Sequence, residues 1–491
     1  MINISEKPIV ALIKNESVYP NNFLPDRIYP EFKEISIHRE TNPDNKIFQS
    51  VRELFKLLKY DEDNIGSSFW NPLSEIIEPG NTVLIKPNFV LDKSKCKDIT
   101  LEVLITHPSL IVAVIDYVIL ALKGNGTIII GDAPIQEAKF EEMIGYLNFF
   151  DYVNDYRKKT DIKFEIIDFR KERSINKIYR EIQRIELSGD PRGYCRVELN
   201  EKSAMKEITH QYKQFRVTNY NKEKMLNFHK ENYHSYLITK SALESDVIIS
   251  MPKLKSHRKA GITCAMKNLV GINGTKDCLP HHRKGSLVEN GDEYPKKSFR
   301  KKLLSNLEEN RAQSKSKLYC FMIFLFKLVL YFFERIFPYK DPIKEGNWYG
   351  NITLPRMILD INYIINFASK EGKIADLNRK RKLFALTDAI ISGEKDGPLC
   401  PTKKATGFIL ASQDFLANDI ISCIIAGFDP LKISTITFAL KSQINVNNIT
   451  TIDNIEIVSN IQEFSDIQSL KLNNKIRFEP TIGWKGHIEL E

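Results

Sequence analysis

Short apolar runs alternate with helical patterns along the first third of the chain. The runs Ile9–Ile13, Thr82–Ile85 and Thr127–Ile130 have the length of buried strands. Between them, Val51–Tyr60 places its apolar residues at helical spacing, and Pro108–Leu122 is apolar throughout, with proline in its first turn. Strands that alternate with helices in this way predict an α/β fold with a doubly wound, mostly parallel sheet.

The second half of the chain continues the alternation. Asp246–Ser250, Leu383–Leu386 and Gly407–Ala411 have the length and composition of strands. Met357–Ile365 and Ile420–Ala426 have the apolar spacing of helices. We therefore expect both halves to contribute to the α/β fold.

The chain has 491 residues, which is more than one hydrophobic core usually serves, so we divide it by composition. The predicted parts are a first α/β half (1–150), a charged inserted subdomain (151–235), a lysine-rich strand–turn–helix motif (236–284), a basic and apolar insert (285–345), a second α/β half (346–435) and a C-terminal appendage (436–491).

The insert contains the sharpest change in composition. Residues 318–333 are apolar, and Lys327 is the only charged residue among them. Sixteen residues fall short of the roughly 20 that a simple membrane span needs. The segment therefore predicts an apolar helix over 318–337 that contacts a membrane surface, with the lysines on both sides of it near anionic headgroups. The alternative is a helix buried in the core or in a dimer interface.

Composition and charge narrow the class of protein. Hydrophobic residues make up 42% and charged residues 27% of the chain, which excludes wholesale disorder. The net charge of +9 favours anionic partners. Seven scattered cysteines indicate a reducing compartment, and Met1–Pro20 lacks the pattern of an export signal, so we expect a cytoplasmic protein, with membrane association through 318–337.

The segment Asp246–His282 concentrates the chemically interesting residues. Lys253, Lys255 and His257 alternate along the chain, so in extended backbone they lie on one face. A following helix over Ala265–Val270 would bring Lys267 and Asn268 to the same place. This composition predicts an anion-binding site.

Clustered ammonium groups also favour catalysis. Their mutual repulsion lowers the pKa of at least one lysine toward the range of a general base, while the others hold a carboxylate or phosphate. The alternative is a solvated basic strand without a role. Placement directly after an apolar strand favours the site, because a solvated run would more commonly lie on a charged helix.

Polar residues also follow other predicted strands or open helices. Lys86 and Asn88 follow one strand, Asp132 follows another, and His107 opens the helix at Pro108, where free backbone N–H groups attract anions. Asp396 lies in a turn-rich link that could bring a carboxylate to the lysines. Each has a simpler alternative, namely a lysine that snorkels, a turn, a helix cap or solvent exposure.

Several familiar signatures are absent from the sequence. There is no phosphate loop, no dinucleotide fingerprint, no zinc-protease motif, no nucleophile elbow and no C-x-x-C pair. Cys278 with His281 and His282 is a weak metal candidate because adjacent histidines point in different directions. We therefore assign no metal, and the cofactor stays unknown.

A set of short motifs resembles the DUF362 family, a domain of unknown function. The matching motifs are Lys86-Pro87-Asn88, Thr106-His107-Pro108, Gly131-Asp132, the block from Met251 to His257, Gly261-Ile262-Thr263, the block from Met266 to Gly271, and Asp388 through Asp396-Gly397-Pro398. Family members that carry a ferredoxin segment are iron–sulfur proteins, but this sequence has no matching cysteines. A distant similarity to the N-terminal half of lactate racemase implies a hydroxy acid or other anionic substrate, without its nickel cofactor.

Together these patterns predict an enzyme that acts on a small or lipid-linked anionic substrate by acid–base chemistry. The predicted catalytic residues are His257, Lys255 and His107. The predicted substrate-binding residues are Lys86, Asn88, Asp132, Lys253, Lys267, Asn268 and Asp396. The alternatives are a non-catalytic protein that binds a polyanion or partner, and a cofactor-dependent redox protein. Nucleic acid is disfavoured because the lysines lack interleaved aromatic residues, and the oligomeric state stays open.

Overall fold

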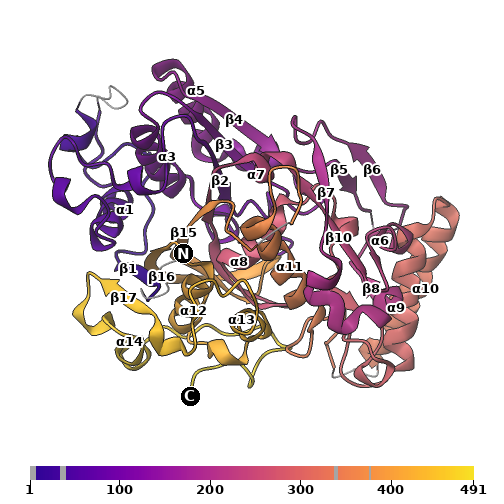
Figure 1. The fold of residues 1–491 in the computed structure, drawn as a ribbon. Coiled ribbons are helices and arrows are strands. Elements are labelled where there is room, and N and C mark those ends of the chain that lie inside the picture. Colours follow the sequence, from indigo (N-terminus) through magenta and orange to yellow (C-terminus); the bar gives the residue numbers. More distant parts are fainter. Residues whose placement is uncertain (1–6, 34–39, 178, 337–340, 375–376) are drawn as a thin grey trace.

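A large mixed sheet organises the computed structural model, which describes residues 7–33, 40–177, 179–336, 341–374 and 377–491 (Figure 1). In this described part, the sheet has ten strands, and its main path runs in the order β17-β1-β16-β15-β11-β2-β3-β4. The strands on this path are β1 (Ile9–Lys14), β2 (Thr82–Pro87), β3 (Thr127–Asp132), β4 (Lys163–Asp168), β11 (Val247–Met251), β15 (Lys382–Asp396), β16 (Cys400–Ser412) and β17 (Glu456–Ser459). Most neighbours are parallel, and β16 pairs antiparallel with β1 and β15. The predicted α/β fold is confirmed.

Helices cover both faces of this sheet. One face packs on α1 (Lys46–Leu57), α3 (Pro108–Leu122), α4 (Phe140–Ile144) and α5 (Phe149–Lys159). The other face packs on α7 (Lys240–Glu244), α8 (Ala265–Asn268), α11 (Thr353–Phe367), α12 (Phe415–Ile425) and α13 (Ser434–Leu440).

Alternate residues of each strand enter opposite cores. In β2, Val83 and Ile85 join the core on the α3 side, while Leu84 joins the core on the α11 side. In β11, Ile249 and Ile248 divide in the same way. Strands buried on both faces need the continuous apolar runs that the sequence shows.

The lysine-rich segment extends the sheet beyond the end of β11. After Pro252, the chain forms β12 (Lys253–His257), which pairs with β15 and, antiparallel, with β13 (Gly261–Thr263). All five residues of β12 are buried. The predicted extended backbone is therefore present, and the segment is part of the protein interior.

The stretch after Leu386, which the sequence predicts to be a turn-rich link, is part of a strand. The turn-rich stretch after Leu386 was expected to leave the sheet, but β15 continues to Asp396 and forms a long hairpin with β16. A register irregularity between Ala389 and Ile391 bends the strand. Pairing with β16 provides the hydrogen bonds that the polar sequence did not reveal.

Smaller sheets follow β4, which itself belongs to the central sheet. The small sheets pair β5 (Glu172–Ile175) with β6 (Gln183–Glu186), β8 (Phe215–Arg216) with β14 (His282–Arg283), and β10 (Tyr233–Thr239) with both β7 (Tyr194–Glu198) and β9 (His229–Lys230). The short helix α6 (Lys222–Met225) lies beside β8.

The apolar insert forms a helical hairpin of α9 (Phe299–Gln313) and α10 (Lys317–Ile336) at the right-hand edge of the view in Figure 1. The predicted helix over 318–337 matches α10, except that residue 337 lies outside the described residues. Among the described helices, none combines the length and the apolar character needed to cross a membrane.

The C-terminal segment is joined to the main fold. β17 pairs in parallel with β1, and α14 (Ile467–Asn473) packs near α12. Trp484 is 1% exposed, and its Nε1 donates a hydrogen bond to the carbonyl of Arg258, 2.9 Å away. The ring lies so close to Gly261 that a Cβ there would be 3.1 Å from it. The appendage therefore supports the turn between β12 and β13.

We predict that Trp484→Ala lowers the free energy of unfolding by about 3–5 kcal/mol, because it leaves a large cavity under this turn. Urea unfolding followed by circular dichroism measures the change. Ile482→Ala is the matched control, since Ile482 is 60% exposed and its truncation should change stability by less than about 0.5 kcal/mol. Equal effects of the two substitutions would contradict the role given to Trp484.

Candidate functional site

The carboxyl ends of three parallel strands meet where the sheet turns into β12. The register pairs Ile85 of β2 with Ile130 of β3, and Lys86 of β2 with Ser250 of β11. Ligands of open α/β sheets gather at this edge. The polar residues that follow these strands are therefore close to one another.

Lys86 is a buried lysine with a buried carboxylate partner. Its Nζ lies 2.8 Å from Oδ1 of Asp132, and it donates to the carbonyl of Pro87 at 2.7 Å and to Oδ1 of Asn268 at 3.3 Å. Burial lowers the pKa of Lys86, and Asp132 opposes that shift. A Cβ on Gly271 would lie 1.9 Å from this carboxylate, so glycine is required for the close approach.

Lys253 lies beside a second buried carboxylate, that of Asp388. Its Nζ lies 2.9 Å from Oδ2 of Asp388 and 2.5 Å from the hydroxyl of Tyr19, which donates to Oδ1 of Asp388 at 2.6 Å. The backbone N–H of His107 also donates to Asp388, at 2.9 Å. Burial lowers the pKa of Lys253. Burial of Tyr19 and the neighbouring charge of Asp388 raise the pKa of Tyr19.

Lys255 has no such carboxylate. Its Nζ donates to Oδ1 of Asn88 at 2.7 Å and to the carbonyl of Leu104, and no described carboxylate forms an ion pair with it. Burial lowers its pKa well below the ordinary value, and the charges on Lys253 and Lys267 lower it further. The result is a buried amine with a weakened hold on its proton.

Lys267 adds a further ammonium group from α8. Within the described part of the chain, its Nζ has neither a hydrogen-bond partner nor an ion-pair partner. Burial lowers the pKa of Lys267 to about 8, and Lys276 and Lys86 contribute to the shift. Burial also brings the pKa values of Lys259 and Lys276 to about 8. Positive charge therefore exceeds negative charge in this part of the protein.

His257 contributes an N–H group. Its Nδ1 accepts hydrogen bonds from the backbone N–H groups of Lys259 at 3.1 Å and Ala260 at 3.0 Å. Burial lowers the pKa of His257, and Lys267 adds to that effect, so the ring is neutral and carries its proton on Nε2. His257 is therefore arranged as a donor to an anion.

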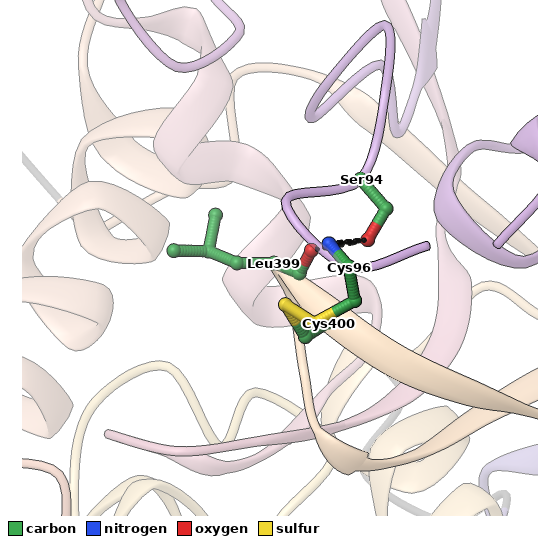
Figure 2. The surroundings of a disulfide bond; sticks show 4 residues. All are labelled: Ser94, Cys96, Leu399 and Cys400. Carbon is green, nitrogen blue, oxygen red and sulfur yellow. Dashed lines mark hydrogen bonds between the residues drawn. A yellow bond between two sulfur atoms is a disulfide. The ribbon is translucent and has the colours of Figure 1, made fainter. Parts of the chain in front are cut away.

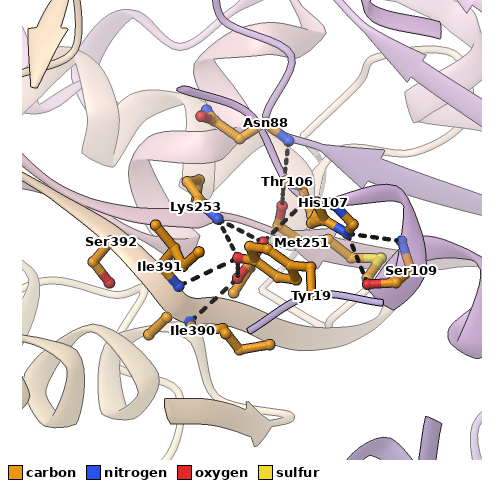
Figure 3. A network of polar contacts seen from close by, with 12 residues as sticks. Tyr19, Asn88, Thr106, His107, Ser109, Met251, Lys253, Ile390, Ile391 and Ser392 are labelled. Carbon is orange, nitrogen blue, oxygen red and sulfur yellow. Dashed lines mark hydrogen bonds and ion pairs between the residues drawn. The ribbon is translucent and has the colours of Figure 1, made fainter. Parts of the chain in front are cut away.

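His107 is held tightly in the wall of the site. Its ring stacks on Tyr19 at a centroid distance of 3.8 Å, and its Nδ1 lies 2.8 Å from Oγ of Ser109 (Figure 3). Burial lowers the pKa of His107, and Lys253 contributes. The ring helps to orient Tyr19 above the Lys253–Asp388 pair.

Most of the predicted site residues lie together. Hydrogen bonds and ion pairs connect Asp132 to Lys86, Lys86 to Asn268, Asn268 to Asn88, and Asn88 to Lys255. Lys253 joins the group through β12, and the electrostatic influence of Lys267 on Lys255 and His257 indicates that it lies nearby.

Asp396 is apart from this group. It lies at the exposed end of β15, whereas Asp388 of the same strand provides the buried carboxylate. No local pattern points to Tyr19, which lies in an irregular stretch 369 residues before Asp388.

A disulfide holds the loop before α2 (Leu101–Leu104) onto the β15–β16 hairpin (Figure 2). It joins Cys96 to Cys400, with 5.5 Å between their Cα atoms, and Oγ of Ser94 donates to the carbonyl of Leu399 at 2.9 Å. The seven cysteines were expected to be reduced, but 304 residues separate this pair and spacing could not reveal it. The attached segment leads to Leu104, whose carbonyl accepts from Lys255.

The weak metal candidate does not form a ligand set. Sγ of Cys278 contacts Oδ1 of Asn273 and the carbonyl of Thr275, and Nδ1 of His281 lies 2.7 Å from the carbonyl of Leu279. In the described ranges, no three histidine, cysteine or acidic residues are grouped so that they could hold a metal ion.

We predict that Asp388→Asn lowers the free energy of unfolding at pH 7 by about 3–5 kcal/mol, because Lys253 would remain buried without its counter-charge. The loss should shrink as the pH rises, since deprotonation of Lys253 removes the unpaired charge. The double variant Asp388→Asn/Lys253→Met should be less destabilised than the single one. Urea unfolding measures all three proteins.

Asp396→Asn is the control, because that carboxylate is exposed. It should change stability by less than about 0.5 kcal/mol. If Asp388→Asn were as mild as Asp396→Asn, the buried pair would not have the energetic role described above.

The chain matches one family model over most of its length. A search of curated proteins gives no match. Among solved structures, a crystal structure of a protein from Thermotoga maritima is similar, with 12% sequence identity and a TM-score of 0.30 over 77% of this chain. This chain spans 58% of the length of that protein. The model described as "Domain of unknown function (DUF362)" matches residues 83–424, and the chain therefore belongs to the DUF362 family.

Proposed function

We propose that the protein is an enzyme that acts on a small or lipid-linked anionic substrate, a carboxylate or phosphate, by lysine and histidine acid–base chemistry. One observation carries this proposal. Lys86 and Lys253 each have a buried aspartate, whereas Lys255 and Lys267 lie in the same region without one.

Charge balance favours an anionic ligand at Lys255 and Lys267. Lys255 is buried and Lys267 is half-buried. Ammonium groups removed from water without counter-charges are costly, so loss of a proton or gain of an anion is favoured at each. A pKa of about 8 leaves Lys267 mostly protonated at neutral pH. The ligand would accept hydrogen bonds from Lys267 and from Nε2 of His257, and its charge would compensate the excess.

Lys255 is the best candidate for the base. A neutral amine has two hydrogens and one lone pair, and the acceptors Asn88 and Leu104 can take both hydrogens. The lone pair is then free to accept a proton from a bound substrate. Burial and the neighbouring charges on Lys253 and Lys267 favour this neutral form. His257 would donate a hydrogen bond from Nε2 to the bound anion, and His107 would orient Tyr19.

The substrate-binding roles follow from the same contacts. Asp132 would hold Lys86 in place, and Asn268 and Asn88 would relay hydrogen bonds between Lys86 and Lys255. Asp396 has no part in this proposal because it lies on the surface.

A second partner is the membrane surface, to which α10 would bind, so that a lipid-linked substrate is included in the proposal.

The rival function is non-catalytic binding of a polyanion. The fully buried positions of Lys253 and Lys255 favour a small ligand over nucleic acid, which needs an accessible basic face. Cofactor-dependent redox chemistry is the other alternative, and an absorbance spectrum of the purified protein tests it.

We predict that inorganic sulfate binds at pH 7 and that Lys267→Met weakens this binding about tenfold or more. Isothermal titration calorimetry at constant ionic strength measures the affinity. Sulfate keeps its charge between pH 7 and 9.5, so only the protein titrates. Raising the pH through the pKa of about 8 removes the proton from Lys267, so the affinity should fall toward pH 9.5.

Lys158→Met is the control, because Lys158 is exposed on α5. It should leave sulfate binding unchanged. Equal affinities of the wild type and Lys267→Met would overturn the anion site. Binding of single-stranded DNA that falls steeply between 50 and 200 mM salt, without any sulfate binding, would favour the polyanion rival.

A further inference from the structure

The outward face of α10 exposes apolar side chains that the lysine site does not use. We propose that this face lies in the plane of a bilayer and binds membranes that contain anionic phospholipids. This inference rests on the membrane part of the proposed function and names the lipid; vesicle binding by α10 and sulfate binding at the lysines can each fail without the other.

The outward face is broad and entirely apolar or aromatic. Its exposed side chains are Leu318, Tyr319, Phe321, Met322, Leu325, Phe326, Leu328, Val329, Tyr331, Phe332 and Phe333. Soluble monomers rarely expose a contiguous apolar patch of this kind unless it binds something. Tyrosine and phenylalanine also suit the boundary between headgroups and acyl chains.

The inner face of α10 accounts for the one charge in its apolar stretch. Cys320, Ile323 and Lys327 are buried against the rest of the protein. The ammonium group of Lys327 pairs with Glu308 of α9. The charge of Lys327 is thus neutralised by an ion pair on the side of α10 that faces away from the bilayer.

Ion pairs fix the hairpin on the body of the protein. Glu309 of α9 pairs with Arg216, Lys284 and Lys222. Lys301 pairs with Asp341 at 2.5 Å. These contacts hold α9 against the body of the protein, and α10 lies at the outer edge of the molecule (Figure 1). The exposed apolar side chains named above lie on this helix.

The charge around the hairpin selects anionic lipid. Residues 296–333 contain nine basic and two acidic residues, and both acidic residues, Glu308 and Glu309, are engaged in the ion pairs above. Lys296, Lys297, Lys315 and Lys317 are exposed, and within the described residues none of them has a carboxylate partner. Lysines beside an apolar helix attract phosphatidylserine and similar headgroups.

The same charge disfavours a second copy of the chain as the occupant. A twofold interface would place this face against itself. Between residues 296 and 333, no acidic residue is exposed to pair with the lysines of the other copy. A bilayer supplies both the apolar medium and the negative charge.

The test is sedimentation of the full chain with vesicles of phosphatidylcholine alone or with 30% phosphatidylserine. We expect strong binding to the mixed vesicles and weak binding to phosphatidylcholine. The double variant Leu325→Glu/Val329→Glu, which places charges on the outward face, should lower binding by at least tenfold. Lys315→Ala/Lys317→Ala should lower binding to mixed vesicles about 30-fold and leave binding to phosphatidylcholine unchanged.

Ile482→Glu is the matched control, since Ile482 is exposed away from the hairpin. It should bind vesicles like the wild type, and all variants should keep the wild-type urea midpoint and sulfate affinity. Absence of wild-type binding, or unchanged binding of Leu325→Glu/Val329→Glu, would overturn the proposal. So would a wild-type dimer in analytical ultracentrifugation that this double variant converts to a monomer, because a second copy would then cover the face.

Discussion

The balance of charge among buried lysines is the constraint on which the rest of the site depends. Lys86 and Lys253 occupy the interior because Asp132 and Asp388 lie within 3 Å of their ammonium groups. Each carboxylate is fixed in turn, by the backbone N–H of Phe89 for Asp132 and by Tyr19 for Asp388. Such pairs are costly to break because the remaining charge would be buried alone. The two ion pairs place opposite charges side by side at this edge of the sheet.

Lys255 and Lys267 have no such carboxylate partner among the described residues, so no ion pair balances their positive charge. Their position explains the direction of their pKa values, since burial and neighbouring ammonium groups both favour loss of a proton. In the proposed function, Lys255 transfers the proton and Lys267 binds the anion, and both roles depend on the same environment. The loop held by the Cys96–Cys400 disulfide leads into α2, whose last residue, Leu104, accepts a hydrogen bond from Lys255 through its carbonyl.

The helices and strands that depend on local sequence patterns were predicted correctly. The helix at Pro108–Leu122 has the predicted bounds because proline begins it and a glycine-rich turn follows it. Alternation placed Lys253 and Lys255 correctly in extended backbone. Contacts between distant residues were beyond such patterns. The positions of Tyr19 and the disulfide depend on tertiary packing. The polar end of β15 is a strand because β16 pairs with it. Asp396 is therefore exposed at the end of this strand, and Asp388 provides the buried carboxylate.

The most direct measurement is the protonation of the lysines themselves. Lysine labelled with ¹³C at the ε position, assigned with single Lys→Arg variants, reports each titration by NMR. The account predicts a midpoint near pH 8 for Lys267 and a midpoint well below the ordinary lysine value for Lys255, with an upward shift of the Lys267 midpoint when sulfate is added. Midpoints of both groups near the ordinary lysine value of about 10.4, insensitive to sulfate, would contradict it.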